Sequence, residues 1–177
     1  DELVNQILLD INNSNITKKA QSLLKNGLQS SGNLFNLEYQ SIKRLKIIIE
    51  RKINEYRKNF NSFDDGFITK WPKNYNLWGW IIIINKGGEL LPHMHKEGWL
   101  SSSIYLRRPK RLSANEGDIK FSLDGANYPK KNKEFKNKII PIETGDMVMF
   151  PSSLFHSTIP FESSEERVTL AFDLIEK

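Results

Sequence analysis

From about residue 66 onward the chain consists of short apolar or alternating segments that are separated by turn residues, with no helical pattern between them. An apolar/polar alternation with a period of two is typical of strands. Consecutive strands without intervening helices pair antiparallel and form a sandwich or barrel, because a parallel sheet needs a helix in each crossover. The expected strands are 78–84, 99–106, 118–123, 138–142, 147–150, 155–159 and 168–174, and the first is apolar enough to be a buried central strand.

The first 60 residues instead show apolar side chains at intervals of three to four, which predicts three helices. The first lies near residues 3–11. The second begins after Thr17, a suitable N-cap, and continues to Leu28, with Leu23 and Leu24 on its apolar stripe. The third runs from about 36 to 60 and is too short to be a convincing coiled coil, so it is expected to pack against a sheet.

Together these patterns predict one domain, with a helical N-terminal layer over 1–62 and a β core over 63–177. Within the core, the segment 107–138 is rich in Lys, Arg, Asn, Gly and Pro. It is expected to form loops at an open end of the barrel, where a substrate would enter, or simply a solvated basic loop.

Composition excludes several classes of protein. The chain of 177 residues has no cysteine, which rules out thiolate metal ligands, a cysteine nucleophile and disulfides. No apolar run approaches the ~20 residues of a membrane span, and the polar start is unlike a signal peptide, so a cytoplasmic protein is expected. The net charge of +5 comes mostly from scattered lysines, so we do not expect a nucleic-acid partner. The oligomeric state is open, and a homodimer is one option.

The three histidines of the chain fall into a pattern typical of a metal site. His93 and His95 are separated by one residue, so in an extended segment they point to the same side. His156 follows Gly145, a short apolar segment and Pro151, which deliver it to a turn. Neutral imidazole is a good ligand for Fe, Zn, Cu or Ni. The sequence therefore favours one metal site over three unrelated histidines.

Two of the expected strands carry polar residues on a single face. Ser101, Ser103 and Tyr105 alternate with apolar residues, and such a face suits a polar cavity better than a core. In the last strand Arg167 shares a face with small residues, where it either pairs with a nearby acid such as Glu165 or binds an anion. We favour the anion, because a guanidinium group can hold a carboxylate with two parallel hydrogen bonds.

These motifs, in this order along the chain, resemble the 2-oxoglutarate-Fe(II) oxygenases that are related to the prolyl 4-hydroxylase-like enzymes. The resemblance extends from about residue 76 to the C-terminus and rests on His93-Met-His95, the segment from Trp99, Gly117, the segment from Gly145 to His156, and Arg167. It implies a mainly β fold, a double-stranded β-helix (jelly roll, cupin-like barrel) with the N-terminal helices packed on the outer face of one sheet. It also implies an enzyme that uses Fe(II), 2-oxoglutarate and O2 to hydroxylate an unidentified substrate, with release of succinate and CO2.

Carried over by position, the resemblance implies that His93 and His156 bind iron and that His95 stands where most such enzymes have the aspartate of His-x-Asp. Arg167 would hold the distal carboxylate of 2-oxoglutarate, assisted by Tyr105, with Ser101 lining the same pocket. Three neutral histidines leave the site more positive than two histidines and a carboxylate. Either Glu97, on the same face if the strand continues, compensates for this charge, or the site is a three-histidine iron centre.

Two alternatives remain open. A cupin shares the jelly roll and fits the spacing of both histidine segments, but it requires a more distant acid than Glu97, has glycine where this chain has Ser153, and gives Arg167 no set role. A jelly-roll binding protein without catalysis is kept open by His95 in place of an acid. The fold prediction is the same in all three cases.

Overall fold

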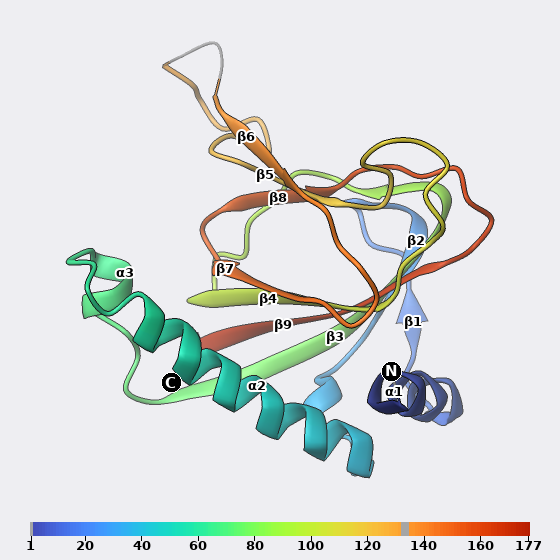
Figure 1. Cartoon of the computed structure of the whole chain (residues 1–177), viewed down its shortest axis with the longest axis horizontal. Coiled ribbons are helices and arrows are strands. Elements are labelled where there is room, and N and C mark those ends of the chain that lie inside the picture. Colours follow the sequence, from blue (N-terminus) through green and yellow to red (C-terminus); the bar gives the residue numbers. More distant parts are fainter. Residues whose placement is uncertain (1, 132–134) are drawn as a thin grey trace.

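A computed structural model describes residues 2–131 and 135–177 and shows two antiparallel sheets with helices outside the larger one (Figure 1). The helices are α1 (Glu2–Asn13), the 3-10 turn η1 (Leu34–Asn36), α2 (Gln40–Asn59) and α3 (Gly66–Thr69). The strands are β1 (Lys18–Lys19), β2 (Leu24–Ser30), β3 (Tyr75–Leu90), β4 (Leu100–Arg107), β5 (Ile119–Ser122), β6 (Asn137–Ile140), β7 (Met147–Pro151), β8 (Phe155–Thr158) and β9 (Arg167–Glu176).

The strand order confirms the predicted jelly roll. The larger sheet runs β1-β2-β3-β9-β4-β7 and the smaller one β6-β5-β8, and every pairing is antiparallel. The seven segments expected to be strands are β3 to β9. In the larger sheet β9 is central, with Ala171 opposite Trp80 of β3 on one side and Ser103 of β4 on the other. Side chains in this row therefore share one face of the sheet.

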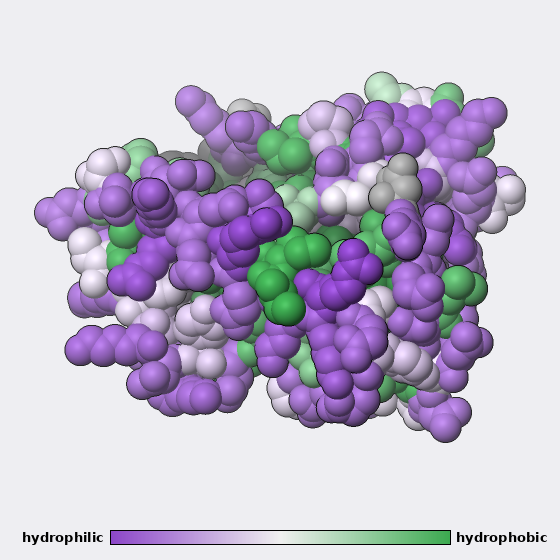
Figure 2. Space-filling model, turned by 60° about the horizontal axis from the view of Figure 1, so that its bottom comes forward, coloured by the Kyte–Doolittle hydropathy of each residue, from purple (hydrophilic) through white to green (hydrophobic). Residues whose placement is uncertain are grey.

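The helix α2 covers the other face of the larger sheet. Its buried stripe, which includes Ile42, Ile49 and Ile53, belongs to one core cluster with Leu100 of β4 and Phe172 of β9. The turn η1 closes onto β3 where Gly79 leaves room for it, since a Cβ there would lie 2.7 Å from the Phe35 ring. Figure 2 shows the molecule with the helix-bearing side turned forward, where hydrophilic side chains surround a small apolar area. The prediction of a sheet-packing helix over 36–60 is confirmed.

The predicted helix from Thr17 to Leu28 is wrong. This segment forms β1 and β2, and β2 pairs with β3. Gly27 permits the pairing, because a Cβ at this position would lie 2.4 Å from the Ile83 carbonyl oxygen. The helical spacing of the leucines is coincidental, since Leu24 is buried while Leu23 and Leu28 are each 41% exposed. Pairing with a long central strand thus overrides local propensity.

The N-terminal layer is therefore α1 and α2 with a strand pair between them, not helical throughout. That the N-terminal layer and the β core form a single domain stays a prediction. Within the described residues, no helix has the length and apolar character that crossing a membrane requires.

Candidate metal centre

The three histidines converge between the two sheets. His93 and His156 form an isolated antiparallel bridge, in which the His93 N–H lies 3.1 Å from the His156 carbonyl and the reverse bond is 2.9 Å. The backbone N–H of His95 donates to the Ser152 carbonyl at 3.0 Å. As a result, one nitrogen from each ring lies within 4.8 Å of those of the other two. Backbone hydrogen bonds thus bring the segments that carry the three histidines together.

Each imidazole has its Nδ1 engaged by an acceptor. In His93 and His156 that acceptor is the backbone carbonyl two residues earlier, at 2.8 and 3.1 Å, and in His95 it is Oδ1 of Asp173 at 2.7 Å. A carbonyl oxygen can only accept, so Nδ1 carries the hydrogen and Nε2 keeps a free lone pair. Metal-bound histidines have this tautomer when their other ring nitrogen donates to a carboxylate or a backbone carbonyl.

Burial keeps two of the rings uncharged. It lowers the pKa of His93 from its usual 6.5 to about 4, and the neighbouring His95 acts in the same direction. Burial also lowers the pKa of His156 well below its usual range, reinforced by the two other histidines. Both rings are therefore neutral at neutral pH, as a metal ligand must be.

Asp173 is the functional candidate that sequence reasoning missed. It lies on β9 opposite Ser101 of β4 and is 7% exposed. Its Oδ1 accepts from the Ser101 hydroxyl at 2.6 Å as well as from His95. The available signal was the alternation of β9, because Asp173 continues the face of Arg167, Thr169 and Ala171.

Three other residues near the predicted site differ in their surroundings. Ser101 is fully buried, and its hydroxyl also lies 2.8 Å from Ser152 Oγ and 3.1 Å from His95 Nδ1, so it supports His95. Glu97 is exposed and outside the histidine cluster, so it does not compensate the charge of the site. Trp99, which precedes β4, packs against the main hydrophobic cluster and donates from Nε1 to the Phe67 carbonyl.

Arg167 is buried at 3% exposure without a carboxylate partner among the described residues. Its Nε–H donates to the Gly117 carbonyl at 2.9 Å and its Nη1 to Thr169 Oγ1 at 2.9 Å, both neutral acceptors. The neighbouring acid Glu165 accepts instead from the backbone N–H of Lys110. Burial lowers the pKa of Arg167, because the low-dielectric surroundings disfavour its charge.

Tyr105 lies beside this arginine. The guanidinium carbon is 4.9 Å from the centre of the Tyr105 ring, close enough for a cation–π contact. The Tyr105 hydroxyl is completely buried and has no hydrogen-bond partner among the described residues. A buried cation without a counterion and a buried hydroxyl without a hydrogen-bond partner are costly unless a ligand completes them.

A cavity of about 270 Å³ connects these groups. The three histidines and Asp173 line one end, and Ala171, Thr169 and Arg167 follow along β9. Two further hollows adjoin it. One, of about 300 Å³, shares Trp80 with the cavity and continues to Trp78, which is 46% exposed. The other, of about 600 Å³, shares His156 and continues under the loop after β5.

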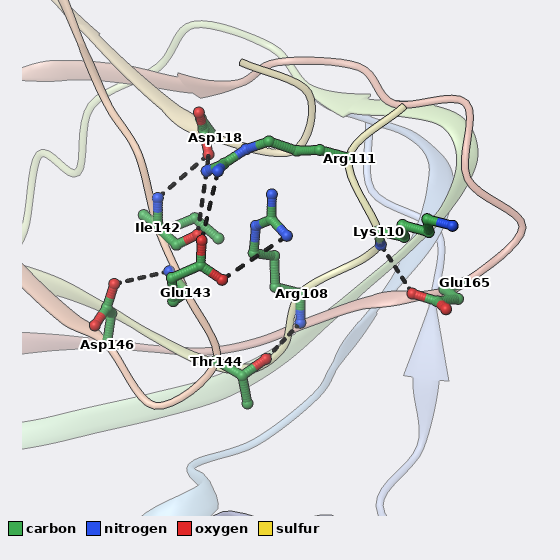
Figure 3. Close-up of polar contacts among 9 residues, drawn as sticks. All are labelled: Arg108, Lys110, Arg111, Asp118, Ile142, Glu143, Thr144, Asp146 and Glu165. Carbon is green, nitrogen blue, oxygen red and sulfur yellow. Dashed lines mark hydrogen bonds and ion pairs between the residues drawn. The ribbon is translucent and has the colours of Figure 1, made fainter. Parts of the chain in front are cut away.

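The loop after β4 is fixed by ion pairs (Figure 3). Arg111 contacts the buried Asp118 at 2.6 Å, and both Arg108 and Arg111 reach Glu143. Asp118 directly follows Gly117, whose carbonyl holds Arg167. Part of the loop region predicted over 107–138, residues 132–134, lies outside the described residues.

A jelly roll with three converging histidines and a buried basic residue in one cavity defines a metal-dependent enzyme with an anionic co-substrate. The chain belongs to the family described as "Putative 2OG-Fe(II) oxygenase", whose model matches residues 79–173, more than half of the sequence. It is therefore a 2-oxoglutarate/Fe(II)-dependent oxygenase. The cupin and the non-catalytic jelly roll are set aside.

Solved structures agree in fold. They include a prolyl-4-hydroxylase from Pseudomonas putida (11% identity, TM-score 0.66, covering 99% of this chain and 87% of that one). HygX from Streptomyces hygroscopicus, solved with nickel and 2-oxoglutarate bound, has 13% identity and a TM-score of 0.67 over 99% and 79% of the two chains. A prolyl hydroxylase from Trichoplax adhaerens, in complex with a hypoxia inducible factor peptide fragment, has 15% identity and a TM-score of 0.65 over 99% and 77%. No curated protein sequence matches the chain.

Proposed function

We propose that His93, His95 and His156 bind iron through Nε2, and that Arg167 binds the distal carboxylate of 2-oxoglutarate. The observation that carries this proposal is the buried Arg167 guanidinium, which lines the cavity without a carboxylate partner among the described residues and lies beside Tyr105, whose buried hydroxyl has no hydrogen-bond partner there. The distal carboxylate of 2-oxoglutarate would satisfy both, one by charge and one by a hydrogen bond. The reaction ends in hydroxylation of a substrate that is still to be identified.

The residues fit the iron. The three imidazoles, with Nδ1 engaged by acceptors and one ring nitrogen each within 4.8 Å of the others, would hold the metal and leave further coordination positions for 2-oxoglutarate and O2. When bound, the metal would supply the oxidising chemistry by which the substrate, O2 and 2-oxoglutarate are converted to hydroxylated substrate, succinate and CO2.

The chain's own residues fit the co-substrate as well. Thr169 and Ala171 have small side chains and stand between Arg167 and the histidine end of the cavity, which leaves space for a short dicarboxylate. Gly117 and Thr169 hold the guanidinium through neutral acceptors, so its charge stays available. Ser101 supports His95 and Asp173, and we do not assign it a contact with 2-oxoglutarate.

Slow conversion of 2-oxoglutarate without primary substrate tests this proposal. With Fe(II) and O2 the protein should form succinate, and His156→Ala and Arg167→Gln should each reduce the rate at least tenfold. Arg107→Gln is the matched control, because Arg107 is exposed and pairs with Glu166 at the surface. Succinate formation that survives both site variants would contradict the assigned residues.

A further inference from the structure

Asp173 is a buried carboxylate beside the histidine cluster. Among the described residues it has no lysine or arginine within ion-pair distance, and its two partners are His95 Nδ1 and the Ser101 hydroxyl. It is 7% exposed and lies directly behind a histidine of the cluster. Burying a carboxylate in this way is costly unless a nearby positive charge repays it.

The histidine cluster lacks a negative ligand. Glu97 is exposed and outside the cluster, and the three ligand candidates are all imidazoles. A site with two histidines and one carboxylate places a negative charge directly on the metal, whereas three neutral histidines do not. The imidazole ring of His95 therefore lies between the proposed metal position and the Asp173 carboxylate.

We propose that Asp173 is a positioning residue that supplies this charge through His95. Its carboxylate accepts the Nδ1 hydrogen of His95, fixes the ring with Nε2 toward the metal, and makes the imidazole more basic. His95 and Asp173 together thus take the place of a carboxylate ligand. This inference rests on the proposed metal site.

The network around Asp173 fits this role. Ser101 stands opposite Asp173 in the sheet and holds the same Oδ1 that His95 uses. Ser101 in turn lies 2.8 Å from Ser152 Oγ, and the Ser152 carbonyl accepts the backbone N–H of His95. The carboxylate and the His95 backbone are therefore anchored to the same short network, which fixes the ring at both ends.

A double-mutant cycle on metal affinity tests the inference. The probe is Co(II) alone, titrated into the metal-free protein, with the dissociation constant from calorimetry and the coordination followed by visible absorption. The four proteins are the wild type, Asp173→Asn, His95→Asp and the double variant. Asparagine keeps an acceptor oxygen at position 173 and removes only the charge.

In the wild-type background Asp173→Asn should weaken Co(II) binding by 10- to 100-fold, as loss of an outer carboxylate does elsewhere. With His95→Asp the metal gains a direct carboxylate, so Asp173→Asn should then cause no loss, and should tighten binding by removing a repulsive neighbour. This change of sign distinguishes a charge role from a structural one, which would weaken binding in both backgrounds. Asp64→Asn, at an exposed acid in the loop before α3, is the matched control and should change nothing.

Co(II) binding by the variant Ser101→Ala provides a second test that does not depend on the double-mutant cycle. It removes one hydrogen bond to Asp173 but leaves the charge, so it should weaken Co(II) binding less than Asp173→Asn does. Unfolding of each metal-free variant is followed by circular dichroism to confirm the fold.

The outcomes separate the inference from the proposed site. If the wild type binds Co(II) and Asp173→Asn binds it equally well, or is equally weakened in both backgrounds, Asp173 does not supply charge and the inference is overturned. If neither the wild type nor His95→Asp binds Co(II), the proposed metal site itself is wrong.

Discussion

At the scale of single residues, two buried groups of opposite charge mark the ends of one strand face. Asp173 lies beside the histidines and Arg167 six residues earlier on β9, and neither is balanced by a charged side chain of opposite sign among the described residues. Such charges cost folding free energy until ligands complete them. The proposed iron and 2-oxoglutarate would complete these two charges, one at each end of the strand face.

Arg167→Met should therefore have opposite effects on binding and stability. The dissociation constant for 2-oxoglutarate should rise at least tenfold, because a charge-assisted bond is worth roughly 1.5–3 kcal/mol. Without 2-oxoglutarate the variant should be as stable as the wild type or more so, because a buried unpaired charge is removed while the packing volume is kept. Calorimetric titration and urea unfolding measure the two effects. Arg107→Met, which removes an exposed arginine, should leave 2-oxoglutarate binding unchanged, and a large loss of stability in Arg167→Met would show that Arg167 has a structural role.

Residue types and spacing were sufficient to predict where the histidines meet and that Arg167 lies without an acid partner. They were not sufficient for Asp173, which is 78 positions from the histidine it contacts. That contact depends on β4 and β9 being neighbours and on their register, neither of which a single sequence displays. Ser101 was placed on the correct face by the alternation within its own strand, whereas its contact with Asp173 depends on the pairing of β4 with β9.

At the scale of elements, the jelly roll depends on α2 covering the outer face of the larger sheet. Ile49 is fully buried in the core cluster, while Ile47, two residues away in the same helix, is 71% exposed. Ile49→Ala should lower the free energy of unfolding by about 2–5 kcal/mol. Ile47→Ala should change it by less than about 0.5 kcal/mol. Chemical unfolding compares the two, and similar losses would mean that α2 is not docked as described.

The secondary-structure elements also show where prediction from the local spacing of apolar residues fails. The strands β3 to β9 and the helix α2 follow from local patterns of apolar residues, alternating or continuous in the strands and at intervals of three to four in the helix. The segment 18–30 does not, since its leucines have helical spacing but its backbone pairs with β3. That pairing requires close approach at Gly27 and a positive φ of 49° at Asn26, both of which depend on the neighbouring strand.

At the scale of the whole molecule, the buried histidines make stability depend on pH. The pKa of His93 is lowered to about 4 in the folded protein, against 6.5 in the unfolded chain. Between these values the unfolded chain binds a proton that the folded protein does not, so the stability of the metal-free protein falls as pH is lowered from 6.5 to 4. His93 alone contributes about 3 kcal/mol to this loss, and His156 acts in the same direction.

Urea unfolding of the metal-free protein between pH 4.5 and 7.5 measures this dependence. His93→Gln removes the titrating group, so the difference in unfolding free energy between wild type and variant should shrink as pH falls below 6.5. A difference that is constant over this range would show that His93 titrates normally in the folded protein.

Iron and 2-oxoglutarate are proposed to bind together in this cavity. The most direct measurement is anaerobic: Fe(II) is added to the protein, then 2-oxoglutarate, and visible absorption is recorded. We expect a charge-transfer band that appears only when both are present, that is weakened in Arg167→Met and absent in His93→Ala. A band that does not depend on His93, or no 2-oxoglutarate binding in the presence of Fe(II), would contradict the account.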